Sequence, residues 1–270
     1  MLSVEEGATL RAWSHVRGVS VDGRPTELAA RVAREALMVA GVAPPSLGLV
    51  VFTGDDVKEH PSWTAALHLQ NRLGAVRALA FDVGFAECGL HAAWKIAGEL
   101  LLALPPGASA LVAGASTSEG SGMSAGAVVM TRGGGGPKLR AVRLSSSGAL
   151  DELAPWSPRS PSSASALGRG LAGCLRLALM EISIPAEALL SVALPDPRRE
   201  TAEALLEGLG SAHLRPAWGS LVAVDTFAAL GALDAWKRDP PEGDVALLGV
   251  GAGVAFAATV LSWRDVGVRR

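Results

Sequence analysis

Cys88 and His91 are the two side chains in this sequence whose types and spacing best suit nucleophilic chemistry. They are three residues apart, which puts them on neighbouring faces of a helix. A histidine beside a cysteine can generate the thiolate, the form of cysteine that attacks carbonyl carbons. Glu87 directly precedes Cys88 and offers a carboxylate for general base chemistry or for assisting a decarboxylation. The alternative interpretation is an inactive site, with Cys88 a small buried hydrophobe, His91 a packed or half-exposed helix residue and Glu87 a helix cap.

The remaining histidines and glycine clusters do not fit another kind of site. The glycines of residues 133–136 lack the Lys-Ser/Thr pair of a phosphate-binding loop. The glycines of residues 249–253 precede an expected strand rather than a helix, which excludes a dinucleotide fingerprint. Cys174 lies among leucines of an expected helix, so we expect it to pack in the core. No metal site is expected, because no metal-like spacing to cysteines or carboxylates is found for His15, His60, His68 or His213.

Apolar runs and amphipathic segments alternate along the first part of the chain. Residues 25–40 place Leu28, Val32, Ala36 and Leu37 on one face of a helix, and Thr26 is positioned to cap it. Residues 47–53 (LGLVVFT) are an apolar run typical of a buried strand. By the same reasoning we expect helices over residues 25–40, 62–73 and 90–104, and strands over residues 47–53, 78–83, 109–115, 125–131 and 139–144.

Residues 155–165 are rich in proline and serine and are predicted to be a linker, after which the alternation restarts. The second part is expected to contain helices over residues 166–180, 200–209 and 226–236, and strands over residues 189–193, 220–224, 244–250 and 253–263. Each part ends in a strand, a glycine turn and a strand, which indicates a duplicated α/β unit with halves at residues 1–154 and 155–270. The alternation favours α/β layers with mostly parallel sheets buried on both faces.

The composition excludes several classes of protein. A chain of 270 residues with 49% hydrophobic and 19% charged residues is expected to fold rather than to be disordered. The net charge of −2 gives no general electrostatic case for nucleic acid. Two cysteines make no disulfide framework and fit a reducing cytosol, so a cytoplasmic location is expected. Residues 245–263 are uncharged, but their glycines favour two buried strands over a membrane span, and no membrane association is expected.

The segment Phe81-Asp82-Val83-Gly84-Phe85-Ala86-Glu87-Cys88-Gly89-Leu90 resembles the nucleophile segment of β-ketoacyl-ACP synthase III enzymes, where a strand turns sharply into a helix. Three further blocks resemble that family in the same order. They are residues 61–74, the strand over residues 124–129 (SAGAVV) and the C-terminal hairpin over residues 243–263. The resemblance spans residues 25–264 and implies a thiolase-like fold, with two duplicated α/β halves in a layered αβαβα arrangement.

The resemblance also implies a site in which a cysteine takes an acyl group from a thioester, while a histidine and an asparagine support decarboxylation and condensation. Aligned without a gap, the family's cysteine position falls on Glu87 rather than on Cys88. The histidine motif falls on residues 194–198, which contain no histidine, and the asparagine motif falls near Asp225. The glycine loop that contributes to the oxyanion hole is retained. The candidate residues are therefore Glu87, Cys88 and Asp225, the loop Gly251, Ala252 and Gly253, and, in addition, His91 and Pro195.

Three functional hypotheses follow from this pattern. The first is a degenerate synthase III-like subunit of fatty-acid, polyketide-type or secondary metabolism, which forms a homodimer or pairs with an active synthase. The second is an active but atypical acyltransferase that uses Cys88 or Glu87. The third is a non-catalytic module that binds an acyl thioester. No cofactor is expected in any of them, with acyl-CoA or an acyl carrier protein thioester as the substrate or ligand.

Overall fold

The computed structural model of this protein describes residues 7–19, 24–54, 63–85, 88–118, 122–146, 161–194, 199–210, 228–238, 240–251 and 255–264. Its contacts divide the chain into two compact units. The first unit comprises Met1–Gly84, Ala92–Leu139 and Asp265–Arg270, and the second comprises Phe85–His91 and Arg140–Arg264. The expected boundary between residues 154 and 155 lies outside the described residues and stays a prediction.

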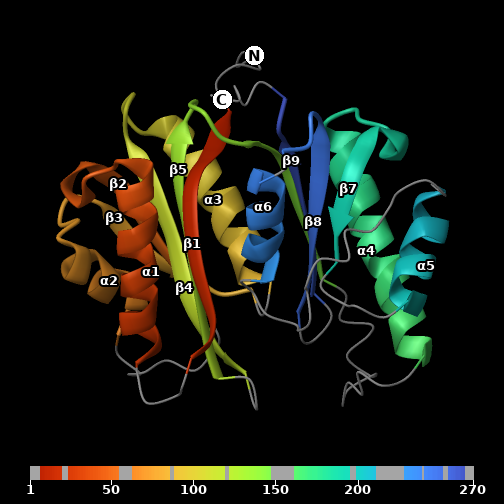
Figure 1. Cartoon of the computed structure of the whole chain (residues 1–270), viewed down its shortest axis with the longest axis horizontal. Coiled ribbons are helices and arrows are strands. Elements are labelled where there is room, and N and C mark those ends of the chain that lie inside the picture. The colour runs from red at the N-terminus through yellow and green to blue at the C-terminus, as the bar shows by residue number, and fades with distance from the viewer. Residues whose placement is uncertain are drawn as a thin grey trace. The chain divides into compact units, whose positions relative to one another are not determined.

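The first unit is built on a mixed sheet with the strand order β3-β2-β4-β5-β1. Strand β2 is parallel to both β3 and β4, whereas β5 is antiparallel to β4 and to β1. The β4–β5 hairpin and β1 lie side by side in Figure 1. The bounds of the strands are Ala8–Val19 for β1, Leu47–Gly54 for β2, Leu79–Val83 for β3, Ser109–Ser118 for β4 and Gly122–Arg132 for β5.

Helices α1 (Pro25–Ala40) and α2 (Ala65–Leu73) cover one face of this sheet (Figure 1). Proline at the first position suits a helix start, since it has no N–H to leave unpaired. Gly41 ends α1 in the left-handed region with φ 64°, a conformation that residues with a Cβ rarely adopt. Helix α3 (Gly89–Ala103) follows β3, and its first three residues belong to the second unit.

Side chains from neighbouring elements cap the ends of these helices. Both carboxylate oxygens of Asp82 on β3 accept hydrogen bonds from the first N–H groups of α2, from Ala65 at 3.0 Å and from Ala66 at 2.7 Å. Arg11 on β1 donates to the carbonyl of Ala40 at the end of α1, at 2.8 Å. A helix carries a partial positive charge at its N-terminus and a partial negative charge at its C-terminus. The Asp82 carboxylate and the Arg11 guanidinium therefore each lie at the helix end that attracts them.

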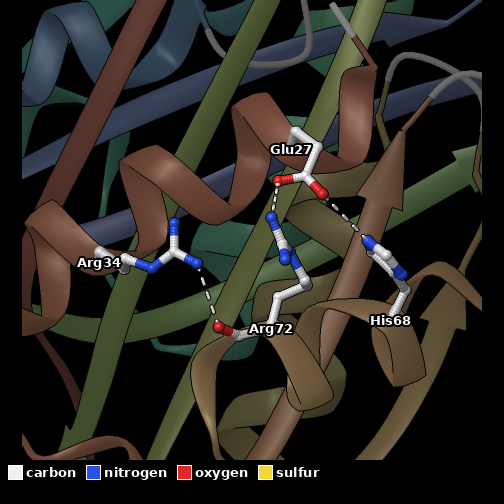
Figure 2. A network of polar contacts seen from close by, with 4 residues as sticks. All are labelled: Glu27, Arg34, His68 and Arg72. Atoms are coloured by element: carbon white, nitrogen blue, oxygen red, sulfur yellow. Dashed lines mark hydrogen bonds and ion pairs between the residues drawn. The ribbon is translucent and has the colours of Figure 1, made fainter.

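A polar network joins α1 to α2 on the surface of the first unit (Figure 2). The Glu27 carboxylate lies 2.7 Å from Nη2 of Arg72 and 3.6 Å from Nε2 of His68. Arg34 donates to the main-chain carbonyl of Arg72 at 3.1 Å. The Arg72 guanidinium is the main reason that the pKa of Glu27 is lowered. Because the Glu27 side chain is 38% exposed, water screens the pair, and such contacts stabilise a protein by less than about 1 kcal/mol.

The second unit repeats the topology of the first. Its strand order is β6-β9-β8-β7, with β7 parallel to β8 and β8 antiparallel to β9, as in the order β1-β5-β4-β2 of the first unit. The strands are β6 (Lys138–Ser146), β7 (Leu189–Ala193), β8 (Asp244–Gly251) and β9 (Ala255–Ser262). The helices are α4 (Pro161–Glu181), α5 (Arg199–Leu209) and α6 (Ala228–Arg238).

The repeat extends to the turns. Helix α1 is followed by a short 3-10 helix over Pro44–Ser46 and then β2, and α4 is followed by a 3-10 helix over Ala186–Ala188 and then β7. Ser183 after α4 has a φ of 55°, like Gly41 after α1, and the N–H groups after both helices bond back to the last turn in the same pattern. The predicted duplication is therefore confirmed down to the caps of the helices.

Two sequence-based expectations about the elements were wrong, and one strand was not predicted. The sheets are mixed rather than mostly parallel, because each strand–glycine turn–strand segment closes as an antiparallel hairpin. Strand β1 was not predicted, because a register shift between Leu10 and Ala12 interrupts its alternation and buries Ala12 beside Trp13. Helix α4 begins at Pro161, inside the expected linker, because proline is compatible with the first turn of a helix.

The uncharged segment over residues 245–263 forms β8 and β9, as predicted. Among the described residues, no helix has both the length and the apolar character that a membrane span requires. The strand expected over residues 220–224 lies outside the described part of the chain.

Candidate functional site

The candidate site lies in the second unit, where the start of α3 meets the β8–β9 hairpin. Directly before α3, the Cys88 N–H donates to the Phe85 carbonyl at 3.0 Å, and both residues belong to the second unit. In the hairpin, Gly249 pairs with Ala257 and Gly251 pairs with Ala255. The hairpin is buried on both faces, so side chains that reach it from α3 are shielded from water.

The Cys88 side chain is completely buried against this hairpin. Its sulfur lies 3.8 Å from the carbonyl oxygen of Ala255, within the range of a weak hydrogen bond. The surrounding cluster is apolar, with Ala255 and Ala257 buried and Phe85 and Leu144 packed against them. Among the described residues most of these contacts are apolar, as around a structural cysteine.

His91 is also buried, with 3% of its surface exposed. Its Nδ1 lies 2.7 Å from Oγ1 of Thr259 on β9, and either atom can be the donor, depending on the tautomer. Burial lowers the pKa of His91 from its usual 6.5 to about 4, so the ring is neutral at pH 7. His91 therefore connects α3 to β9 through a neutral hydrogen bond.

Gly249 explains how the two side chains fit against β8. A Cβ at this position would lie 2.8 Å from Nε2 of His91 and 3.3 Å from the Cys88 sulfur. Cys88 and His91 thus converge on the same glycine. Sequence reasoning missed Gly249 and Thr259, although a glycine inside an apolar strand is a signal of close approach by another group.

The structure describes only some of the predicted site residues. It brings Cys88 and His91 together, and it places Gly251 as the buried last residue of β8. The candidate residues outside the described part of the chain are Glu87, Pro195, Asp225, Ala252 and Gly253. Their roles stay predictions.

The second cysteine is a core residue, as expected. Cys174 on α4 is 2% exposed and its sulfur lies 3.4 Å from the Arg143 carbonyl. Burial raises the pKa of the Cys174 thiol to about 11, against smaller opposing effects of Arg143 and of a backbone hydrogen bond from Ala258. Among the described residues, no group of three His, Cys, Asp or Glu side chains could hold a metal ion.

No protein-family model and no curated protein sequence matches this chain. Solved structures do resemble it closely in fold. The 3-oxoacyl-[acyl-carrier-protein] synthase III FabH from Pseudomonas aeruginosa PAO1 has a TM-score of 0.75 at 21% identity, with 96% of this chain and 99% of that chain covered. The acyltransferase ChlB3 has a TM-score of 0.77 at 20% identity, with 95% and 97% covered.

A variant of OleA from Xanthomonas campestris was solved with bound lauric acid and lauroyl-CoA. It has a TM-score of 0.76 at 16% identity, with 96% of this chain and 100% of that chain covered. These likenesses confirm the predicted fold class, which is a thiolase-like α/β fold with two duplicated halves. The low identities agree with a chain that is divergent within this fold.

Proposed function

We propose that this protein binds acyl thioesters without forming an acyl-cysteine. In this proposal it is a degenerate subunit that pairs with an active synthase of the same fold, in fatty-acid, polyketide-type or secondary metabolism. The observation that carries the proposal is the burial of both cysteines of the chain in apolar surroundings. A cysteine nucleophile must present its thiolate to the thioester carbonyl, and the burial of both sulfurs argues against that use.

The fold supports the choice of ligand. The likenesses to a 3-oxoacyl-[acyl-carrier-protein] synthase, to an acyltransferase and to a protein solved with lauroyl-CoA all concern proteins whose names or ligands involve acyl groups. An acyl-CoA, or the thioester of an acyl carrier protein, is therefore the ligand class to test first. Because fold by itself does not determine activity, the proposal depends on the site rather than on the likeness.

The position of Cys88 argues against a cysteine-based condensing reaction. Among the described residues its sulfur lies against Ala255, Ala257 and the surface of Gly249, in a fully buried position. His91 is neutral and engages Thr259 through Nδ1. Cys174, whose pKa is about 11, is almost entirely protonated at pH 7.

The edge of the first sheet supports association with a partner. Strand β3 ends the strand order, and its outer edge pairs with no other strand in the described part of the chain. Leu79 on this strand is 60% exposed, and Val76 just before it is 70% exposed. An unpaired strand edge with exposed apolar side chains is suited to pairing with the same edge of another subunit.

A second candidate function is an atypical acyltransferase that uses Cys88, and the convergence of Cys88 and His91 on Gly249 favours it. Intact-mass measurement separates the two. The purified protein is incubated with butyryl-CoA and with lauroyl-CoA, and binding is measured in parallel by calorimetry. We expect binding without a mass increase. An acyl adduct that maps to Cys88 and is lost in Cys88→Ser would overturn the proposal and establish the second candidate.

The Glu87→Cys variant tests the alignment that puts residue 87 at the nucleophile position. If that alignment is right, this variant becomes acylated by the thioesters that the wild type only binds. A Glu87→Ser variant is the matched control, since serine has a hydroxyl in place of the thiol.

Co-purification of a synthase of the same fold from the native host tests the pairing. If no such synthase co-purifies at physiological expression, the result counts against a partner subunit.

A further inference from the structure

The outer surface of the first unit carries three arginines close together, where α1 lies beside α2. Arg31 and Arg34 are both exposed and lie about one turn apart on α1. The Arg34 guanidinium donates to the main-chain carbonyl of Arg72 near the end of α2, at 3.1 Å (Figure 2). The Arg72 guanidinium lies 2.7 Å from Glu27, one turn before Arg31 on α1. We call Arg31, Arg34 and Arg72 the arginine patch.

The arginine patch has more positive than negative charge. Glu27 balances the charge of Arg72, whose hydrogen bond lowers the pKa of this carboxyl and keeps it ionised at pH 7. Glu35 is turned towards β1, where its carboxylate accepts a hydrogen bond from a serine hydroxyl at 2.7 Å. Among the described residues, Arg31 has no ion pair or hydrogen bond. Arg31 and Arg34 therefore carry uncompensated positive charge on a chain whose net charge is −2.

The second unit shows which part of this arrangement the duplicated fold requires. Arg176 on α4 repeats the bond of Arg34, with the main-chain carbonyl of Gly208 near the end of α5 as the acceptor. When the two repeats are aligned at the turns that end their helices, Gly173 and Gly208 take the places of the other two arginines of the patch. The bond between the helices thus belongs to the fold, whereas the two further guanidinium groups do not.

We propose that the arginine patch binds an acidic helix of another protein. Carboxylates three or four residues apart on a helix lie about 5–6 Å apart, which matches the spacing of Arg31 and Arg34. Arginine binds carboxylates through parallel N–H donors, and the bond to α2 holds Arg34 in place before the partner arrives, which lowers the cost of ordering it. Met38 is 76% exposed one turn beyond Arg34 and offers an apolar contact beside the charges.

An anionic membrane or a nucleic acid fits this surface less well. Helices that lie on membranes turn their apolar face to the lipid, but the apolar face of α1 is buried in the core of the first unit. Binding to nucleic acid depends on the number of phosphates that cations neutralise, and only Arg31 and Arg34 are uncompensated here. The inference concerns the first unit alone and does not depend on the binding of acyl thioesters.

The test uses a fluorescent synthetic helix of about 20 residues, with glutamates at every fourth position and leucines one turn apart between them. Fluorescence anisotropy measures its affinity at about 50 mM and about 300 mM salt. We expect the wild type to bind this peptide, more weakly at the higher salt. Arg31→Gln combined with Arg34→Gln should weaken binding about tenfold or more at the lower salt.

Arg169→Gln combined with Arg176→Gln is the matched control. It removes the same charge and the equivalent bond between helices from the second unit, and it should leave the affinity unchanged. Arg31→Gln alone breaks no printed contact of the fold, so it should retain the wild-type Tm and still weaken binding by roughly threefold. Met38→Gln should weaken binding of the leucine-containing peptide, but not of the same peptide with alanine in place of leucine.

Three results would overturn the inference. The first is that the acidic peptide does not bind. The second is an equal loss of affinity in the two double variants, because binding would then depend on the charge of the whole chain. The third is tighter binding to phosphatidylserine vesicles or to a DNA duplex that is lost in the Arg31 and Arg34 double variant. None of these results affects the proposed function, which the acyl-CoA measurements test separately.

Discussion

At the scale of single residues, His91 is the group whose chemistry the fold changes most. Its ring is buried between α3 and β9, and burial lowers its pKa to about 4. In the unfolded chain the same ring titrates near 6.5. Between these two values the unfolded chain binds a proton that the folded protein does not, so the free energy of unfolding falls as the pH falls through this window.

The first prediction concerns this acid sensitivity. The contribution of His91 to the free energy of unfolding is fully present above pH 6.5. It is lost progressively as the pH falls to 4, and the total loss is roughly 3 kcal/mol. His91→Gln, which retains a polar group for Thr259, should show a smaller loss of stability over the same range. Urea unfolding at pH 7, 5.5 and 4.5 measures the difference, and parallel pH profiles of the variant and the wild type would contradict the buried neutral state.

The second prediction concerns Gly249. A Cβ at Gly249 would press on Nε2 of His91 and on the Cys88 sulfur, so Gly249→Ala should destabilise the protein by about 1–3 kcal/mol. Gly231 on α6 is the matched control, because a Cβ there meets nothing within 4 Å. Gly231→Ala should be neutral or stabilising, by up to about 1 kcal/mol, since alanine favours helices. Equal effects of the two variants in urea unfolding would show that Gly249 has space for a side chain.

At the scale of elements, α2 depends on tertiary contacts for its stability. The helix has nine residues, which is too short to be stable in isolation. Its N-terminus is capped by Asp82 of β3, and its C-terminus ends at Gly74 and receives a hydrogen bond from Arg34 of α1. Each cap comes from a different element, so the helix is held only when the sheet and α1 are both formed.

The third prediction tests the Asp82 cap. Asp82→Ala removes both acceptors and the negative charge at the start of α2, and it should cost about 1–2 kcal/mol. Asp82→Asn retains one side-chain oxygen and should cost less. Hydrogen exchange measured along the chain should show faster exchange in α2 than in α1 for the alanine variant. Uniform acceleration throughout the first unit would mean that the cap acts on global stability alone.

At the scale of the whole molecule, one pattern of strands and helices occurs twice. In both units a helix, a 3-10 turn and a strand precede a hairpin, and the hairpin joins the inner strands of its sheet. Within the described part of the chain, β3 and β7 end the strand order; the first unit exposes Leu79 on β3, and the second exposes Leu190 on β7. The proposed partner uses the first of these edges.

The fourth prediction distinguishes the two edges. Leu79→Arg should abolish association with the partner subunit, or self-association if the protein forms homodimers, because it puts a charge on the β3 edge. Leu190→Arg is the matched control, with a leucine that is 52% exposed on a strand of the other unit. Light scattering coupled to size exclusion measures the masses. Loss of association in the Leu190 variant alone would assign the interface to the second unit.

Local patterns were sufficient for most elements of this protein. Helix α1 was predicted with the bounds that the structure shows, because its amphipathic spacing and Gly41 are both signals within a few residues. The thiolase-like fold was predicted from short motifs in a fixed order. Strand β1 escaped prediction because its bulge breaks the alternation on which such a prediction depends.

The sequence by itself determined where most of the helices and strands lie, that the pattern is duplicated and that Cys174 packs among leucines of a helix. Only the tertiary structure decided that His91 meets Thr259, 168 residues away, and that Cys88 and His91 share the surface of Gly249. It also decided that Thr9 has a hydrogen-bond partner, whereas the Thr53 hydroxyl has none among the described residues. The reason is physical: periodicity and capping act over a few residues, whereas burial and hydrogen bonding depend on which distant segments the folded chain packs together.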